Sequence, residues 1–80
     1  MNINVLAFGI AKDIFGASAI EVELPEAGTV TDLRSKLEEK YPRLKQLASY
    51  MIAVNDAYAA DGDALQQQDE VAIIPPVSGG

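Results

Sequence analysis

The residues of this 80-residue chain that point most directly to chemistry are its last two, Gly79 and Gly80. Two terminal glycines leave the carboxylate without a neighbouring side chain, and glycine adopts backbone angles that other residues avoid. Pro75 and Pro76 restrict φ and stiffen the base of this arm. A stiff base with a narrow tip suits insertion into the active site of another protein. The alternative is an ordinary frayed chain end.

The remaining side chains offer little chemistry of their own. The sequence has neither His nor Cys, which removes the commonest general base, thiolate metal sites, disulfides and an internal persulfide. Asp61 and Asp63 flank Gly62, but the spacing and closing Glu of an EF-hand loop are missing. We therefore expect an acidic turn there and no metal site. Without a P-loop or a Gly-x-Gly-x-x-Gly motif, we also expect no cofactor bound by this chain.

Composition predicts one small globular domain. The content of hydrophobic residues, 49%, favours a packed core over disorder. Six basic and twelve acidic residues give a net charge of −6, which opposes binding to nucleic acid or an anionic membrane and favours a basic partner surface. The sequence shows no secretory signal pattern and no apolar run long enough to cross a membrane, so we expect a cytoplasmic protein.

Alternation of apolar and polar residues predicts a set of short strands. The predicted strands span residues 3–8, 19–24, 51–54 and 70–74, with a short return strand at 57–60. Strand 19–24 alternates most clearly, because Ile20, Val22 and Leu24 share one face and glutamates occupy the other. In strands 3–8 and 70–74 the odd-numbered residues are expected to point inward.

One amphipathic helix is expected between the second and third strands. Thr29 and Asp32 have the spacing of a capped helix start, and Pro42 ends the helix. An apolar stripe runs along it through Val30, Leu33, Leu37 and Tyr41. Smaller features are a helical turn near residues 12–15, a short helical piece at Leu44 and Leu47, and Leu65 reaching the core from irregular chain.

This order of elements predicts an α+β fold of the β-grasp, or ubiquitin-like, type. One helix covers one face of a mixed sheet, and the last strand closes the sheet by pairing in parallel with the first. That arrangement places a free C-terminal Gly-Gly arm at one end of the central strands. We expect a β-grasp domain over residues 1–76 and a flexible tail over residues 77–80.

Two large apolar residues have the parity of the solvent face, Phe8 and Ile74. Both stand at the carboxyl ends of strands expected to be neighbours, and Tyr58 is expected nearby. With Leu6 and Val77 they would form an apolar patch leading to the arm, as expected of a protein interface. The alternative is that they are scattered surface residues of no special role.

These motifs together resemble the small subunit of molybdopterin synthase, the MoaD family of ubiquitin-like sulfur carriers. The resemblance covers the whole chain, and its most specific part is the ending from Pro75 to Gly80, Pro-Pro-Val-Ser-Gly-Gly. It also rests on Val5-Leu6-Ala7-Phe8-Gly9, on Lys12-Asp13-Ile14-Phe15-Gly16, on Val30-Thr31-Asp32-Leu33, on Tyr41-Pro42, on Val54-Asn55 and on Asp69-Glu70.

The resemblance implies a non-catalytic, sulfur-donating subunit of a sulfurtransferase complex. An adenylating partner related to ubiquitin-activating enzymes would use ATP to activate the Gly80 carboxylate, and a sulfur donor would convert it into a thiocarboxylate. The large synthase subunit would receive the arm, and the sulfur would attack a cyclic pyranopterin monophosphate. Gly80 would be the covalent carrier and Gly79 would keep the tip narrow. The expected partner contacts are Phe8, Tyr58, Ile74, Pro75, Pro76, Val77 and Ser78.

Two other functions remain open from the sequence. One is a related β-grasp sulfur carrier that serves thiazole or another product, and the other is a ubiquitin-like modifier or a plain interaction module. One departure from the family pattern is Gln68, which stands where the family usually has glycine before Asp69 and Glu70. If that turn required a positive φ, Gln68 would be strained by about 1 kcal/mol or more.

Overall fold

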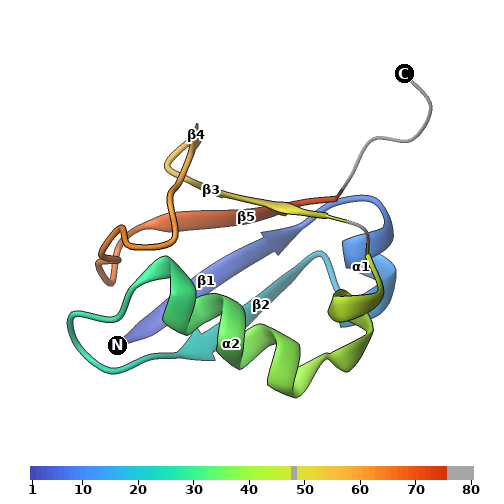
Figure 1. The fold of residues 1–80 in the computed structure, drawn as a ribbon, viewed down its shortest axis with the longest axis horizontal. Coiled ribbons are helices and arrows are strands. Elements are labelled where there is room, and N and C mark those ends of the chain that lie inside the picture. Colours follow the sequence, from blue (N-terminus) through green and yellow to red (C-terminus); the bar gives the residue numbers. More distant parts are fainter. Residues whose placement is uncertain (48, 76–80) are drawn as a thin grey trace.

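The computed structural model describes residues 1–47 and 49–75, and it shows one mixed sheet with a helix packed across one face (Figure 1). The predicted domain end at residue 76 and the tail 77–80 lie outside the described residues. The elements in chain order are β1 (Asn2–Ala7), α1 (Ile10–Phe15), β2 (Ala19–Glu23), α2 (Val30–Lys40), the 3-10 helix η1 (Pro42–Gln46), β3 (Met51–Val54), β4 (Ala57–Tyr58) and β5 (Glu70–Ile74).

The strand order is β2-β1-β5-β3-β4. The last strand, β5, lies at the centre and pairs with β1 in parallel, with Val5 opposite Val71 and Ala7 opposite Ile73. The other pairings are antiparallel. This topology confirms the predicted closure of the sheet, and it brings the carboxyl ends of β1 and β5 to the same edge of the molecule.

The core lies between the sheet and α2. Its strand residues have the predicted parity, since Ile3 and Val5 of β1 and Val71 and Ile73 of β5 are all fully buried. Helix α2 contributes Val30, Leu33 and Leu37, and Leu44 of η1 and Leu65 of the irregular chain complete the core, as expected. Burying a Val, Leu or Ile side chain contributes about 1.5–3 kcal/mol, so this packing is the main stabilising contribution in so small a domain.

The first turn of α2 is tied to distant parts of the chain. The Thr29 hydroxyl accepts the Asp32 amide and the Asp32 carboxylate accepts the Thr29 amide, which confirms the predicted capping box. The amides of Val30 and Thr31 donate to the carbonyls of Asp63 and Asp61. The acidic turn therefore serves to cap α2, and these backbone donors are occupied within the chain.

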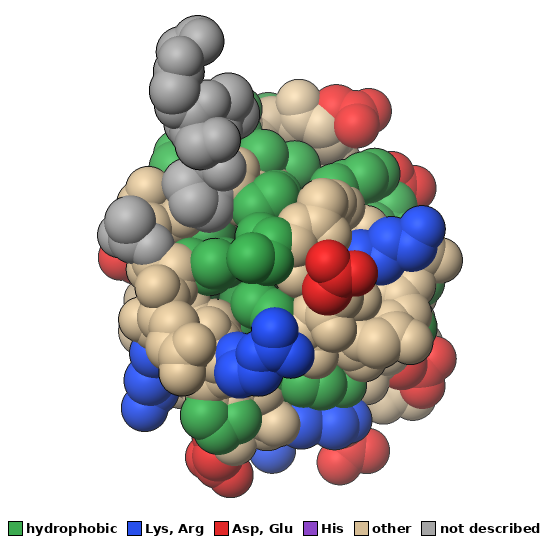
Figure 2. Space-filling model, turned by 90° about the vertical axis from the view of Figure 1, so that its right-hand side faces the viewer, with side chains coloured by type: hydrophobic (Ala, Val, Ile, Leu, Met, Phe, Trp, Pro, Cys, Tyr) green, Lys and Arg blue, Asp and Glu red, His purple; other side chains and the backbone are tan. Residues whose placement is uncertain are grey.

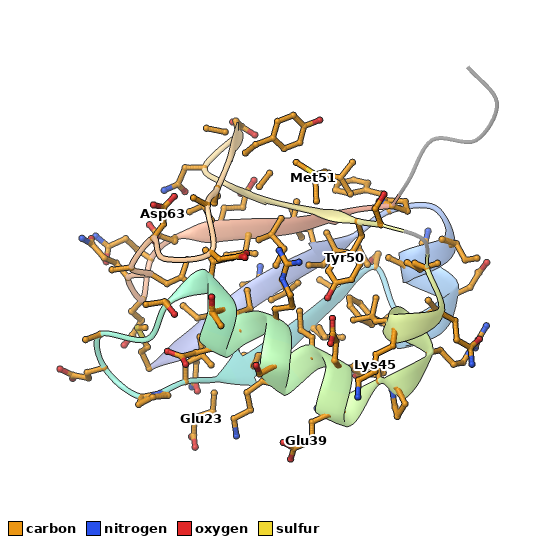
Figure 3. All side chains as sticks on the ribbon, viewed as in Figure 1. Glu23, Glu39, Lys45, Tyr50, Met51 and Asp63 are labelled. Carbon is orange, nitrogen blue, oxygen red and sulfur yellow. The ribbon has the colours of Figure 1, made fainter. Side chains whose placement is uncertain are left out.

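Tyr50 connects α2 to the start of β3. Its hydroxyl donates to the Glu38 carboxylate at 2.5 Å, and the Arg34 guanidinium lies 5.3 Å from its ring centroid. Arg34 also pairs with Asp61 at 3.1 Å. In Figure 3, Tyr50 lies between the sheet and the helical layer, whereas Met51 lies on the other side of the sheet. Burial and the adjacent Glu38 raise the pKa of Tyr50 above its ordinary value.

The structure differs from the predictions at several element ends. Strand β1 begins one residue earlier than expected, at Asn2, and β2 ends one residue earlier, at Glu23. Strand β1 ends at Ala7, because the carbonyl of Phe8 accepts the amide of Ala11 and begins the α1 turn. Helix α1 is accordingly longer than the expected turn at residues 12–15. Strand β4 stops at Tyr58 instead of residue 60, because the Ala60 amide donates to the Asp63 carboxylate and the chain turns away.

The departure at Gln68 causes no backbone strain. Among the described non-glycine residues, positive φ occurs at Ala27, Asn55 and Asp56, and Gln68 is not one of them. Positive φ at both Asn55 and Asp56 is the requirement of a type I′ turn, which joins β3 to β4 as a tight hairpin.

Candidate functional site

The candidate site is the face of the sheet that α2 leaves uncovered. Strand register places four side chains in one row across it, because Leu6 pairs with Ala72, Ala72 with Ala53, and Ala53 with Tyr58. The two central residues are alanines, whose short side chains leave a depression between the larger side chains of Leu6 and Tyr58. The result is a hollow of about 390 Å³ on the sheet. It is lined by Leu6, Phe8, Ala53, Asp56, Tyr58, Glu70, Ala72 and Ile74.

A second apolar row lies nearer the arm. Met51 of β3 pairs with Ile74 of β5, and Phe8 follows the end of the neighbouring β1. Three side chains of the two rows are strongly exposed to solvent: 69% of Tyr58, 50% of Phe8 and 47% of Met51 is accessible. Figure 3 shows Met51 on the side of the sheet away from α2. We call the set Leu6, Phe8, Met51, Ala53, Tyr58, Ala72 and Ile74 the apolar face.

The structure brings three of the predicted partner-binding residues together. Phe8, Tyr58 and Ile74 all line the same hollow, although they come from three separate segments. Pro75 follows Ile74 directly and is half-buried. The other predicted site residues, Pro76, Val77, Ser78, Gly79 and Gly80, lie outside the described residues. Their roles stay predictions.

Two exposed apolar residues escaped the sequence analysis, Met51 and Ile10. Met51 is adjacent to the fully buried Ile52, so its parity marks it as outward-facing. Ile10 begins α1 and is 47% exposed. The sequence carries no signal for Met51, because β3 has no polar residue that would mark its outer face. It carries none for Ile10 either, because α1 is too short to show a period.

Basic side chains are confined to the helices, whereas acidic side chains occur on helices, strands and turns alike. All six Lys and Arg residues belong to helices: Lys12 of α1, Arg34, Lys36 and Lys40 of α2, and Arg43 and Lys45 of η1. The charged side chains of the described strands are all glutamates, and Asp56 and Glu70 border the hollow. Figure 2 views the end of the molecule that carries α1, where Lys and Arg side chains border a central hydrophobic group. Asp56 and Glu70 form an acidic rim on the hollow of the apolar face.

The base of the arm contacts the loop between β1 and α1. Gly9 has φ 55° and ψ −131°, and a Cβ added to it would lie 3.2 Å from the Cγ of Pro75. Figure 1 shows the end of β5 beside the segment that leads into α1. The arm thus begins next to a residue that has no side chain.

The described residues contain no assembled reaction centre. Residues 1–47 and 49–75 hold no group of three or more His, Cys, Asp or Glu side chains that could bind a metal ion. None of the helices in the same ranges has the length and apolar composition needed to cross a bilayer. An apolar, acid-rimmed hollow is suited to docking a protein.

Comparison with known sequences gives full-length matches. The ThiS family profile matches residues 5–80. A molybdopterin synthase sulfur carrier subunit from Arabidopsis thaliana is 35% identical over 81 residues, which cover 100% of this chain and 84% of that protein. A protein of the same name from Caenorhabditis briggsae is 39% identical over 83 residues, with coverage of 100% and 99%.

Several solved structures have the same fold. Putative molybdopterin converting factor subunit 1 from Pyrococcus furiosus has a TM-score of 0.88 at 28% identity, covering 96% of this chain and 99% of that one. SAMP1 from Haloferax volcanii has a TM-score of 0.86 at 26% identity, with both chains fully covered. A complex of molybdopterin-converting factor subunits 1 and 2 from Helicobacter pylori contains a chain with a TM-score of 0.72 at 27% identity, again with full coverage. These matches confirm the predicted β-grasp fold.

Proposed function

This chain belongs to the ThiS family, and we propose that it is the sulfur-carrier subunit of a molybdopterin synthase, acting in molybdenum cofactor biosynthesis. One observation carries the proposal. Similarity to sulfur carrier subunits extends over the entire chain, at 35–39% identity in the two sequences compared above. The family predicted from the Pro-Pro-Val-Ser-Gly-Gly ending is thereby confirmed.

The reaction uses the terminus and not the body. The Gly80 carboxylate attacks the α-phosphate of ATP in an adenylating partner, pyrophosphate leaves, and an acyl-adenylate forms. A sulfur donor then displaces AMP, which leaves a thiocarboxylate. A carboxylate needs this activation because it is a poor electrophile without a good leaving group. The thiocarboxylate is ionised at neutral pH and is a soft nucleophile, as a thiolate is.

The large synthase subunit is the proposed acceptor of the arm. The Helicobacter pylori structure, in which subunit 1 of a molybdopterin-converting factor forms a complex with subunit 2, supports such a partner. In the proposed complex the thiocarboxylate sulfur attacks a cyclic pyranopterin monophosphate, and water then hydrolyses the resulting thioester, which leaves the sulfur on the pterin and restores the Gly80 carboxylate. Two such transfers build the dithiolene. The chain itself binds neither ATP nor metal in this scheme, and the partner supplies the catalytic groups.

The apolar face is the proposed docking surface for both partners. Its exposed members Phe8 and Met51 lie beside Ile74, the residue before Pro75, so a protein seated there receives the terminus as well. Large exposed apolar patches usually mark interfaces. The acidic rim at Asp56 and Glu70 favours partners with basic residues around an apolar centre.

Reconstitution of the transfer tests the proposal. Thiocarboxylated chain, the large subunit and cyclic pyranopterin monophosphate should yield the dithiolene, with two chains consumed for each product. A chain treated identically without sulfur donor is the matched control. Efficient sulfur delivery to a thiazole precursor with no dithiolene would favour the related carrier function. Isopeptide-linked conjugates on target lysines would favour a modifier, the function indicated by the name of the SAMP family.

A further inference from the structure

The contact between Gly9 and Pro75 links the arm to the body. The parallel pairing of β1 with β5 ends at Ala7 and Ile73, and Gly9 and Pro75 each lie two residues beyond it. These two residues stand just beyond the ends of the central strands. Pro75 is therefore the first residue of the arm, and Gly9 is the backbone neighbour against which it rests.

The conformation of Gly9 excludes a side chain. Its φ of 55° and ψ of −131° lie in a region open essentially to glycine alone. A Cβ would also lie 3.2 Å from the Pro75 Cγ, closer than an ordinary van der Waals contact. Backbone freedom and close approach thus both require glycine at this position.

Neighbouring elements hold Gly9 in place on both sides. Gly9 is held on one side by the core strand β1 and on the other by α1, whose Ala11 is fully buried. The Gly9 carbonyl accepts the Lys12 amide at 3.1 Å, which fixes its orientation. A side chain on Gly9 would therefore press on the Pro75 ring in addition to straining the Gly9 backbone. Because Pro75 has a fixed φ, a shift at its ring changes the direction of the chain that follows.

We infer that Gly9 is a positioning residue that sets the direction in which the C-terminal arm leaves the body. The arm must bring the Gly80 carboxylate to a reacting atom in the partner, five residues beyond Pro75. Misplacement by about 1 Å can slow a reaction by about 10²-fold. Gly9 thereby controls the rate of activation and transfer without contacting a reacting group, and this effect on rate rests on the proposed function.

A double-mutant cycle tests the inference. The variants are Gly9→Ala, Pro75→Ala and the two combined, since Pro75→Ala removes the Cγ that the new methyl group would meet. Gly16→Ala is the control, because Gly16 also has positive φ, 73°, at the other end of α1, but no atom lies within 4 Å of an added Cβ. The readouts are the rate of thiocarboxylate formation, the Kd for the large subunit, and the amide chemical shifts of residues 77–80.

We expect Gly9→Ala to lower the rate at least tenfold while the Kd changes less than threefold and the arm amides shift. Gly16→Ala should change neither the rate nor the arm amides. In the Pro75→Ala background, Gly9→Ala should lower the rate at least threefold less than it does with Pro75 present, because only the backbone strain at Gly9 remains. Additive losses in the cycle, or an unshifted arm in Gly9→Ala, would overturn the inference. If the unsubstituted protein gains no sulfur, the proposed function fails, and the amide shifts still decide whether Gly9 positions the arm.

Discussion

Met51 of β3 lies opposite Ile74 of β5 on the uncovered face of the sheet. Ile74 is the last residue of β5 and immediately precedes Pro75, so this pair joins the apolar face to the base of the arm. A partner that buries Met51 is therefore brought directly to the start of the arm. In the proposed function, docking and presentation of the terminus therefore become one event.

Replacing Met51 with lysine should weaken binding without unfolding the protein. Because the side chain is 47% exposed, Met51→Lys should change the free energy of unfolding by about 0.5 kcal/mol or less. It should raise the Kd for the large subunit at least tenfold, since a charge would enter the centre of an apolar contact. Titration calorimetry measures the Kd, and Ser35→Lys, exposed on α2, is the matched control.

Phe8→Lys and Ile74→Lys should weaken binding in the same way. Phe8 is 50% exposed, and Ile74 is half-buried on the same face. Both side chains line the hollow, so both lysine variants should lose affinity for the large subunit and for the activating partner. If thermal unfolding instead shows a loss of several kcal/mol, the assignment of these side chains to the docking face is wrong.

Association should be weakened by salt. The acidic rim at Asp56 and Glu70 attracts a basic partner surface, and the Debye length falls from about 10 Å at 0.1 M to about 3 Å at 1 M salt. We expect a severalfold slower association at 0.5 M than at 0.05 M NaCl, measured by stopped-flow fluorescence. Glu70→Gln should flatten this salt dependence, whereas Glu39→Gln on the opposite side of the molecule should not. Equal salt slopes for the two variants would argue against steering by the rim.

Tyr50 should make stability depend on pH in alkaline solution. The folded state raises the pKa of Tyr50, by burial and then by the Glu38 carboxylate, so the folded protein keeps the phenolic proton longer than the unfolded chain does. The stabilisation is complete below the unfolded pKa of about 10 and is lost as the pH rises above it, by up to about 1.4 kcal/mol per pH unit.

Tyr50→Phe isolates this contribution. The variant should lose about 1–2 kcal/mol at pH 7, because the hydrogen bond to Glu38 disappears. Its free energy of unfolding should also decline less steeply than that of the unsubstituted protein between pH 10 and pH 11 (about the range just above the unfolded pKa). Urea titrations at several pH values measure both effects. Parallel pH profiles would show that the hydroxyl titrates as it does in the unfolded chain.

Substitution at Gly79 should separate folding from transfer. Gly79→Val adds an isopropyl group at the tip, and its branched Cβ restricts the side-chain rotamers. The substitution does not alter the core strands or α2. The far-UV circular dichroism and the melting temperature should therefore stay unchanged, and sulfur transfer should fall at least 10²-fold (an effect of the size expected for misplaced reacting groups). Near-normal transfer would mean that the partner channel is wide at this position.

The sequence predicted the fold well because the alternation is explicit where polar residues mark the outer face. Glu21 and Glu23 fix the faces of β2, and Asn2 and Asn4 do the same for β1. Strand β3, Met-Ile-Ala-Val, has no polar residue, so its outer face was not assigned and Met51 was missed. The face of such a strand becomes clear only when its pairing with β5 is known.

The contact at the base of the arm could not be predicted from sequence. Gly9 and Pro75 are 66 positions apart, and neither local pattern nor turn chemistry indicates that they touch. The parallel pairing of β1 with β5 brings them together, and the glycine conformation is visible only in the backbone angles. The end of β4 at Tyr58 likewise depends on a side-chain contact from Asp63 to the Ala60 amide.

The most direct test of the central claim is the intact mass of the chain after incubation with ATP, an adenylating partner and a sulfur donor. Replacement of one terminal oxygen by sulfur should raise the mass by about 16 Da, a change that a variant lacking Gly80 should not show. An unchanged mass, under conditions in which the same partners load another carrier with sulfur, would contradict the assignment of this chain as a sulfur carrier.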